Sequence, residues 1–400
     1  MLRKIIPPIA SAARNFSICE LPAHLQELQK TCHSFADREL KPVAAELDRD
    51  ARFPAEQIAK LADLGLMRVT VDPEYAGSGL NMLALSLVVE ELSRGCGSTG
   101  SIVSIHNCLF ANLLNRVGAE EQKQHFFGKY SNNSIGVFAL SESDAGSDVA
   151  ALNTKAQREG DFWILNGTKA WVTSAKEAQY GVIFATVDTD LKYKGITAFL
   201  LDFDNATGLT VGPNEDKLGI RATSTCNLHL DNVRVRSSNV LGSIGGGFRL
   251  AMEQLDRARI GIASQALGIA QAALEAAVGY AEQRIAFGQP LLKLSSVQTR
   301  IAEMALRIES TRLLVRKAAV EIDRNERSTK ACSMAKWFAG ETATFAAHNC
   351  LQIMGGMGYV KNMPAERFYR DARITEIYGG VTDVQKTIVA EQVIEQLKGR

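Results

Sequence analysis

The chain reads Phe138-Ala139-Leu140-Ser141-Glu142-Ser143-Asp144-Ala145-Gly146-Ser147-Asp148 and, further on, Trp163-Ile164-Leu165-Asn166-Gly167-Thr168-Lys169-Ala170-Trp171-Val172-Thr173. The first stretch ends a predicted strand and continues into a turn, whose hydroxyl and backbone N–H groups suit an anion or the polar edge of a cofactor. The second is a predicted hairpin arm in which Trp171 and Thr173 are two residues apart and therefore share one face of a strand. The alternatives are an ordinary turn and a core tryptophan.

Both stretches lie in a region, residues 135–240, that has the residue pattern of a β-sheet. Short runs rich in β-branched and aromatic residues alternate there with turn signals such as Asn166-Gly167. The runs outside the two quoted stretches are residues 180–187, 196–201 and 226–235. We therefore expect a middle antiparallel β domain.

Helical periodicity flanks this region on both sides. Before it, apolar residues recur at helical spacing in residues 25–47, 55–67, 82–93 and 119–127. After it, the same pattern occupies residues 248–285, 296–324, 328–354 and 381–397, the first of them rich in Ala and Gly, which permits close packing. The predicted fold class is α+β multidomain, with an N-terminal α-helical domain (17–134), the middle β domain (135–240) and a C-terminal four-helix bundle (241–400).

The first sixteen residues have the composition of a mitochondrial transit peptide. Arg3, Lys4 and Arg14 are basic, and no acidic residue precedes Glu20. The run Arg14-Asn15-Phe16-Ser17 resembles a matrix-protease cleavage site, so we expect removal of this segment and residence in the mitochondrial matrix. Removal takes away three positive charges and changes the formal net charge from +1 to −2. The alternative is a start of the chain without regular structure.

Charge balance and cysteine pattern exclude several classes of partner. Lys and Arg number 45 against 44 Asp and Glu, which leaves no basic excess for nucleic acid. No apolar run approaches the roughly 20 residues of a membrane span. The seven cysteines are scattered without C-x-x-C pairs or Cys/His clusters, so we expect free thiols and no metal. Neither G-x-G-x-x-G opening a strand–helix unit nor G-x-x-x-x-G-K-[ST] occurs, so a nucleotide cofactor would need another binding mode.

Together, the two quoted stretches resemble the two flavin-binding segments of the acyl-CoA dehydrogenase family in order and separation. Later motifs are similar to the C-terminal motifs of that family, namely Leu255-Asp256-Arg257-Ala258-Arg259, Arg284-Ile285-Ala286-Phe287-Gly288, Gln352-Ile353-Met354-Gly355-Gly356-Met357-Gly358-Tyr359 and Pro364-Ala365-Glu366-Arg367-Phe368-Tyr369-Arg370-Asp371-Ala372-Arg373. The resemblance covers about residues 20–395 and is closest to the short-chain branch. It implies FAD as the cofactor and a homotetramer.

The resemblance also implies a role for each matching residue. Flavin contacts are implied for Phe138, Leu140, Ser141, Ser147, Trp171 and Thr173. Contacts with the FAD pyrophosphate and adenosine of a neighbouring subunit are implied for Arg284, Phe287, Gln352, Gly355 and Gly356, and further cofactor contacts for Thr382 and Asp383. Substrate contacts are implied for Ser147, Asp256, Arg259 and Gly380. Without the resemblance, Asp256 and Arg259 are an i, i+3 ion pair on a helix surface.

One position departs from the family pattern. Where the family has a motif resembling Ile-Tyr-Glu-Gly-Thr-Ser, whose glutamate removes the α-proton, this chain reads Ile377-Tyr378-Gly379-Gly380-Val381-Thr382. Gly379 therefore occupies the position of the catalytic base. Other branches of the family carry the glutamate at the position of Ala258.

Glu376 and Asp383 are the carboxylates nearest to this position in the sequence. Either would share a helical face with Gly379 if the segment were continuously helical, but two consecutive glycines indicate a turn. Their alternative roles are a salt bridge to Arg373 or Arg370 for Glu376 and a charge at a helix N-terminus for Asp383.

The expected function is FAD-dependent oxidation of short-chain acyl-CoA to trans-2-enoyl-CoA in mitochondrial fatty-acid β-oxidation. Electrons would pass to electron-transfer flavoprotein, with activity impaired because loss of a general base typically lowers a rate by about 10² to 10⁴. The alternative is a catalytically inactive paralogue that binds FAD or acyl-CoA and has a regulatory or assembly role. A third possibility is an oxidase or monooxygenase on the same fold, which needs no α-proton base.

Overall fold

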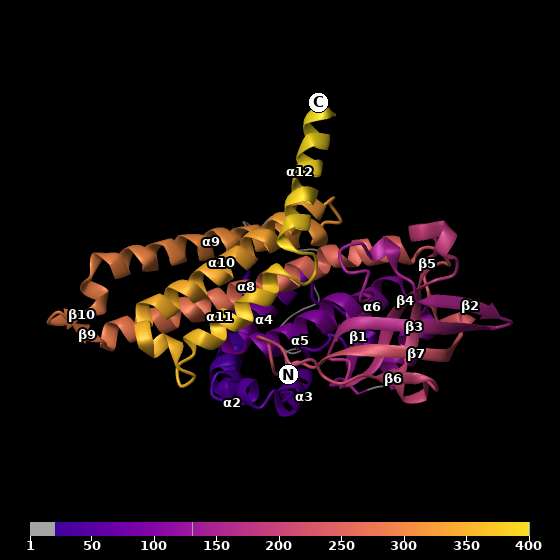
Figure 1. Cartoon of the computed structure of the whole chain (residues 1–400), viewed down its shortest axis with the longest axis horizontal. Coiled ribbons are helices and arrows are strands. Elements are labelled where there is room, and N and C mark those ends of the chain that lie inside the picture. The colour runs from indigo at the N-terminus through magenta and orange to yellow at the C-terminus, as the bar shows by residue number, and fades with distance from the viewer. Residues whose placement is uncertain (1–20, 130, 400) are drawn as a thin grey trace.

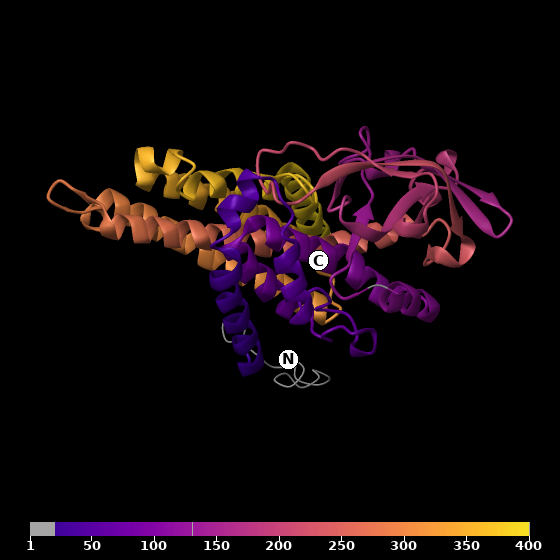
Figure 2. The same ribbon diagram turned by 90° about the horizontal axis from the view of Figure 1, so that it is seen from below.

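The computed structural model describes residues 21–129 and 131–399, which form three parts along one long axis (Figure 1). Helices of the N-terminal part lie at the centre, the sheet lies at one end, and the long C-terminal helices extend to the other end (Figures 1 and 2). The predicted transit peptide lies outside the described residues.

The N-terminal part is helical, as its periodicity predicts. Its α-helices are α1 (Ala23–Phe35), α2 (Ala44–Arg49), α3 (Ala55–Asp63), α4 (Met82–Gly95), α5 (Gly97–Ile105), α6 (Asn112–Val117) and α7 (Glu120–Lys129). Helix α4 is buried along its whole length. It begins after Asn81, whose side-chain oxygen accepts a hydrogen bond from the backbone N–H of Ala84 at 3.0 Å.

The middle part is a sheet with strand order β6-β7-β3-β2-β4-β5-β8. Its strands are β1 (Ile135–Ala139), β2 (Lys155–Glu159), β3 (Phe162–Thr173), β4 (Ala178–Thr186), β5 (Ile196–Asp202), β6 (Leu209–Val211), β7 (Thr225–Arg236) and β8 (Val240–Leu241). Most neighbours are antiparallel, as predicted, but β1 runs parallel to β4 and the sheet is therefore mixed. The β2–β3 hairpin lies between β1 and β4 in the sequence. It brings the chain back to the side of the sheet from which β1 starts, so β4 can run in the same direction as β1.

The C-terminal part contains α8 (Gly247–Gln283), α9 (Ser295–Asp323), α10 (Thr329–Met354), α11 (Ala365–Arg373) and α12 (Thr382–Lys398), with a short hairpin of β9 (Ile285–Ala286) and β10 (Gln289–Pro290) between α8 and α9. The small residues of α8 permit close packing as expected, since a side chain at Gly268 would overlap the backbone of α4. Helix α11 packs on α8 and α10, whereas α12, which corresponds to the fourth predicted bundle segment, projects from the body (Figure 1).

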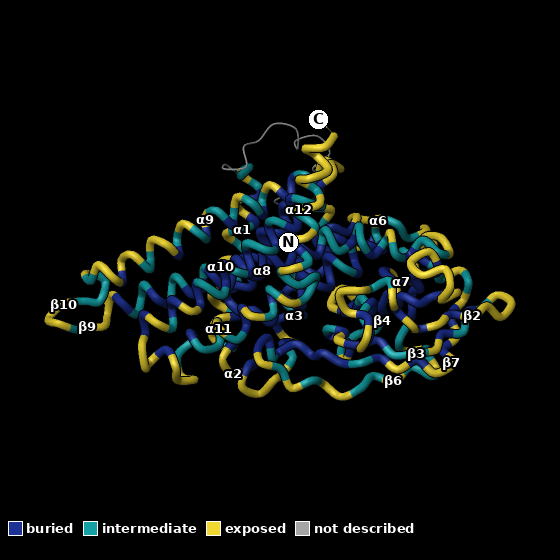
Figure 3. The backbone as a smooth tube through the Cα atoms, turned by 45° about the horizontal axis from the view of Figure 1, so that its top comes forward, coloured by how far each residue is buried: buried dark blue, intermediate teal, exposed yellow. Residues whose placement is uncertain are grey.

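Buried residues gather along α8 and the helices around it (Figure 3). Helix α8 is long and apolar enough to cross a membrane, but 78% of its most apolar window is buried inside the protein, which is the pattern of a core helix.

Hydrogen bonds to two carboxylates join the three parts. Asp323 at the end of α9 accepts hydrogen bonds from the backbone N–H groups of Met82 and Leu83, at 2.8 and 3.1 Å, and so caps α4 from another domain. Asp371 of α11 accepts a hydrogen bond from the N–H of Ile220, which follows β6, at 2.5 Å. The bundle therefore holds both the N-terminal helices and the sheet.

Candidate active site

The two stretches quoted first lie against each other. The N–H of Ala170 on β3 donates to the carbonyl of Ser141 after β1, at 2.9 Å. The Lys169 ammonium donates to the carbonyl of Leu140 at 3.1 Å and to the Glu142 carboxylate at 2.8 Å. The turn and the strand predicted to hold the flavin are thus one cross-linked unit.

Trp171 stands out within this unit because its side chain is 62% exposed and its φ is +60°. This left-handed conformation is costly for a bulky residue and is found most often at functional positions. It lies where the register between β3 and β7 shifts, between Lys169 and Val172, so a β-bulge directs the indole outward. Neither the bulge nor the positive φ could be read from the alternation of residues alone.

The other residues implied in flavin contacts lie nearby in the chain but differ in exposure. Ser147 is exposed, Phe138, Ser141 and Thr173 are half-buried, and Leu140 is buried. The Phe138 ring packs against Phe184 at 4.7 Å between centroids. Phe138 also belongs to the apolar cluster that Leu255 of α8 contacts, which links the sheet to the helix that carries Asp256.

Lys169 and Glu142 are residues of this site that the sequence did not single out. Both are buried, and Glu142 also accepts hydrogen bonds from the backbone N–H groups of Asn153 and Thr154, at 2.6 and 2.9 Å. Burial lowers the pKa of Lys169 to about 8 although Glu142 opposes this. Burial alone would raise the pKa of Glu142, but Lys169 and the N–H donors lower it. The signal available in the sequence was a lysine at an inward position of an apolar strand.

We expect Lys169→Met to lower the free energy of unfolding by about 3 kcal/mol, because it leaves the Glu142 carboxylate buried without its cation. Urea denaturation followed by tryptophan fluorescence measures this. The exposed Lys155 on β2 is the matched control, and Lys155→Met should change stability by less than about 0.5 kcal/mol. Equal effects of the two substitutions would contradict a structural role for the buried pair.

A second group surrounds Gly379, between α11 and α12. Gly379 and Gly380 both have positive φ, +65° and +96°, so the chain turns here, as the paired glycines predict. A Cβ atom at Gly379 would meet the terminal methyl of Ile262 on α8. The buried Lys336 of α10 donates to the carbonyl of Gly380 at 2.6 Å and holds the turn in place.

Two buried cations lie beside this turn. Burial lowers the pKa of Lys336 to about 7, and the charge of Arg259 adds to this, while Glu376 opposes it. Arg259 donates to Asp256 at 2.6 Å, and Thr329 donates to the other oxygen of that carboxylate at 2.7 Å. The i, i+3 pair expected at Asp256 and Arg259 therefore exists, but it is buried rather than on the surface. Within the described part of the chain, Nε of Arg259 is buried without a hydrogen-bond partner.

The two neighbouring carboxylates differ in their surroundings. Glu376 pairs with Arg373 at 2.8 Å and accepts a hydrogen bond from Thr344 of α10, which is the salt bridge anticipated for it. Asp383 is exposed in the first turn of α12, the other position anticipated. Thr382 is half-buried, and its hydroxyl donates to the carbonyl of Glu376 at 3.4 Å.

The third group lies at the far end of the bundle. Phe287 is 90% exposed in the β9–β10 hairpin, and Arg284 precedes it (Figure 1). Gln352, Gly355 and Gly356 lie at the end of α10 on the same side of the molecule, with open space where side chains of the two glycines would be (Figures 1 and 2). Helix α8 separates this end from the sheet, and its 37 residues span about 55 Å. One chain does not bring Arg284 to Trp171.

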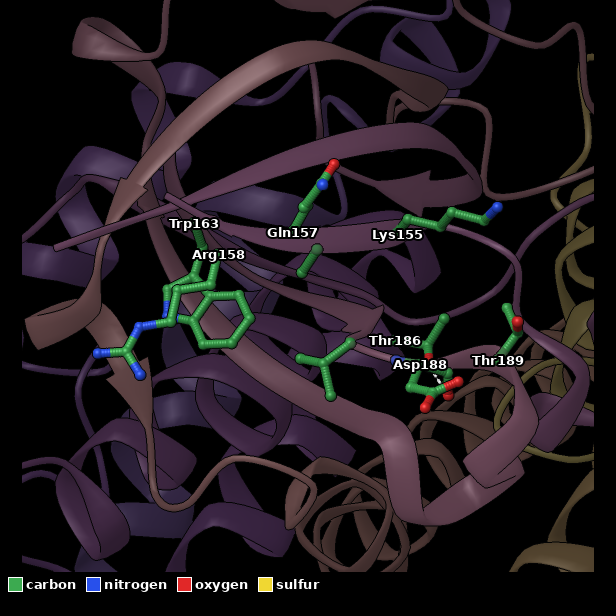
Figure 4. Close-up of a pocket in the computed structure, with 9 residues that line it drawn as sticks. Lys155, Gln157, Arg158, Trp163, Thr186, Asp188 and Thr189 are labelled. Carbon is green, nitrogen blue, oxygen red and sulfur yellow. Dashed lines mark hydrogen bonds between the residues drawn. The ribbon is translucent and has the colours of Figure 1, made fainter. Parts of the chain in front are cut away.

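A cavity of about 500 Å³ on the sheet contains none of these residues (Figure 4). It lies where β2 and β4, paired only at Lys155 and Thr186, separate from each other. Trp163 and Asp188 contribute to its walls.

The low pKa of Lys336 predicts a pH-dependent stability. Its folded-state pKa of about 7 lies below the ordinary 10.5, so the folded protein binds fewer protons across that window. The free energy of unfolding therefore rises with pH between 7 and 10.5, on the order of 1 kcal/mol per pH unit, and this contribution is lost as pH falls through about 7. Urea denaturation at pH 6, 8 and 10 should show the slope in the natural chain and not in Lys336→Met. Parallel profiles for the two proteins would contradict it.

A helical domain, a sheet that presents an exposed tryptophan, and a helical bundle, in this order, define a class of flavin-dependent oxidoreductases. The chain belongs to the acyl-CoA dehydrogenase family. Family models of the N-terminal, middle and C-terminal domains of acyl-CoA dehydrogenase match residues 22–133, 137–233 and 245–394. The family and the fold class predicted from the sequence are thereby confirmed.

Named relatives are similar over nearly the whole chain. The mitochondrial short-chain specific acyl-CoA dehydrogenase of Bos taurus is 51% identical over 380 residues, which are 95% of this chain and 92% of the relative. The structure of butyryl-CoA dehydrogenase from Megasphaera elsdenii has a TM-score of 0.91 at 36% identity and covers 95% of this chain and 100% of its own. A chain in the structure described as electron transferring flavoprotein of Acidaminococcus fermentans has a TM-score of 0.91 at 37% identity, with 94% and 98% covered.

Proposed function

We propose that this protein binds FAD and short-chain acyl-CoA and converts the acyl-CoA to trans-2-enoyl-CoA, at a rate limited by the missing base at Gly379. The observation that carries the proposal is the exposed Trp171 on a cross-linked turn-and-strand unit, in a chain about half identical to short-chain specific relatives. FAD, when bound, accepts the two electrons that leave the substrate.

The residues of the first group fit a flavin. An exposed indole held in a left-handed conformation offers a flat face without needing to rearrange. Half-buried hydroxyl groups at Ser141 and Thr173 offer hydrogen bonds beside it. The Lys169–Glu142 pair keeps the two segments in register and so orients the tryptophan.

We infer that a second copy of the chain completes the cofactor site, as in a homotetramer. The exposed Arg284 carries a positive charge suited to a pyrophosphate, and the open backbone at Gly355 and Gly356 permits close approach. Arg284 follows the last residue of α8, whereas the sheet packs against the first part of that helix, whose 37 residues span about 55 Å. Two copies in opposite orientation would place the far end of the bundle of each copy beside the sheet of the other copy.

The proton step is where this chain differs from an ordinary family member. Substrate would lie between the Asp256–Arg259 pair and the Gly379 turn, where Lys336 donates a hydrogen bond to the carbonyl of Gly380. No carboxylate is carried at Gly379, and Glu376 is held by Arg373 and Thr344. The turn can therefore shape the pocket and exclude water without accepting the α-proton.

The missing carboxylate at Gly379 also favours a second candidate function, that of an inactive paralogue that binds FAD and acyl-CoA. In that case the chain would regulate or assemble with active subunits. Binding depends on Trp171, Arg284 and Arg259, none of which is altered by a glycine at position 379.

The location and the electron acceptor are proposed with support from the relatives and from the sequence. The basic first sixteen residues and the mitochondrial relatives support the mitochondrial matrix. Electron-transfer flavoprotein is proposed as the acceptor, supported by the similar chain in a structure described as that of an electron transferring flavoprotein.

Anaerobic mixing with butyryl-CoA separates the two candidates. The purified, FAD-loaded protein should bind butyryl-CoA, seen as a shift of its visible flavin spectrum, and bleach slowly, over minutes or longer. Binding without any bleaching identifies the paralogue. Absence of both the spectral shift and bleaching would refute acyl-CoA as the ligand. In a separate mixing experiment in air, a rapid reaction with oxygen without electron-transfer flavoprotein would favour an oxidase.

A further inference from the structure

A second cavity, of about 340 Å³, lies where the N-terminal helices meet the bundle. Its walls come from the start of α2, the end of α4, the middle of α8 and the segment 361–368 that leads into α11, elements that adjoin one another (Figures 1 and 3). We call it the junction cavity. None of the residues implied in cofactor or substrate binding lines it.

The lining of the junction cavity is strongly basic. Lys41, Arg94, Lys361 and Arg367 contribute four cations against one carboxylate, that of Glu275. Arg94 is already neutralised, since it pairs with Asp37 at 2.8 Å and Glu275 at 2.9 Å. Glu275 is thereby engaged, and its other oxygen accepts a hydrogen bond from Gln271 at 3.0 Å.

Of the remaining three cations, Arg367 lies over the Phe368 ring at 5.6 Å from its centroid and acts on the buried Asp371, whereas Lys41 and Lys361 line the cavity at exposed positions. Within residues 21–129 and 131–399, Lys41, Lys361 and Arg367 form no ion pair within 4.0 Å. The Lys41 charge lowers the pKa of Asp37, but the hydrogen bond of that carboxylate goes to Arg94. Lys41 and Lys361 therefore give the cavity positive charge that no described carboxylate pairs with within 4.0 Å, an arrangement that favours an anion.

Two further features narrow the class of anion. Helix α11 begins at this wall, after Pro364, and no side chain caps its first turn; Glu366 in that turn is paired with Arg370 at 2.7 Å, so the N–H groups and the helix dipole add to the attraction for negative charge. The floor is apolar, formed by Ala272 and Ala276 of α8 with Phe368 of α11. Cations on one side and an apolar floor on the other suit a phosphate attached to a flat apolar group.

We propose that the junction cavity binds a small organic phosphate, with the phosphate between Lys41, Lys361 and the start of α11 and the flat group on the alanines of α8. The bound molecule would bridge the N-terminal helices and the bundle. It would act apart from the Gly379 turn and from Trp171, so the inference is independent of the proposed catalysis.

Calorimetric titration of the FAD-loaded protein with adenosine 5′-monophosphate tests this. Lys41→Gln combined with Lys361→Gln should weaken binding at least about tenfold, since each replaced cation removes a charge-assisted contact. Lys398→Gln, at an exposed lysine on α12, is the matched control and should leave affinity unchanged. The visible flavin spectrum, which should be the same in all three proteins, verifies that each is folded.

Separate titrations with inorganic phosphate and with adenosine measure how much the phosphate group and the flat group each contribute to the affinity. Both should bind more weakly than the monophosphate. The binding of inorganic phosphate should be lost in the double variant. Failure of the monophosphate to bind, or equal affinity in the natural chain and the double variant, would overturn the proposal. Equal affinity for inorganic phosphate and the monophosphate would refute the role given to the apolar floor.

Discussion

Replacing Gly379 by glutamate is expected to raise the rate of flavin bleaching by butyryl-CoA by about 10² to 10⁴, the usual contribution of a general base. The unit proposed to bind the flavin, the Asp256–Arg259 pair and Lys336 are in place, so the substitution supplies the carboxylate that the turn lacks at position 379. Anaerobic stopped-flow absorbance, comparing natural and substituted proteins at saturating butyryl-CoA, measures the ratio.

The substitution also has a predictable cost. A side chain at φ +65° is strained by about 1–2 kcal/mol, and its Cβ meets the terminal methyl of Ile262. That methyl ends a flexible side chain, so combining Gly379→Glu with Ile262→Val should recover part of the lost stability. Gly379→Gln has nearly the same shape without a base and should bleach no faster than the natural chain. Rapid bleaching of the natural chain would mean that another group accepts the proton.

Helical periodicity predicted the long helices closely because each pattern is local, whereas the shorter α5, α6 and α11 were not among the predicted segments. The segment expected at 328–354 is α10, Thr329–Met354, and the one expected at 296–324 is α9, Ser295–Asp323. Pairing between distant strands is not local, which is why the parallel alignment of β1 with β4 was missed. The direction of α12 was equally out of reach, since it depends on two successive positive φ values at Gly379 and Gly380.

The residues of the candidate site also divide into those that the sequence pointed to and those that only the fold reveals. Trp171 was recognised from its motif, but its exposure comes from a bulge that only the β3–β7 register reveals. Lys169 and Lys336 were missed although Lys169 holds an inward position in an apolar strand, because the carbonyl groups that accept hydrogen bonds from both lysines are brought near only by the fold. Roles for Arg284 and Phe287 came from the family resemblance alone and remain predictions, which makes their placement at the far end of α8 the most useful feature to test.

Arg284→Gln and Trp171→Ala, made in separate chains, are each expected to weaken FAD binding about 10- to 100-fold, through a lost charge-assisted contact and a lost stacking surface. If each site combines Trp171 of one chain with Arg284 of another, a hybrid of the two chains contains one doubly damaged site and one intact site. Co-expression with two different affinity tags, purification through both, and measurement of FAD per protein should then recover tight binding in half of the sites. A hybrid that retains no more FAD than either parent would contradict a site shared between two chains, which is inferred from the position of Arg284 at the far end of α8.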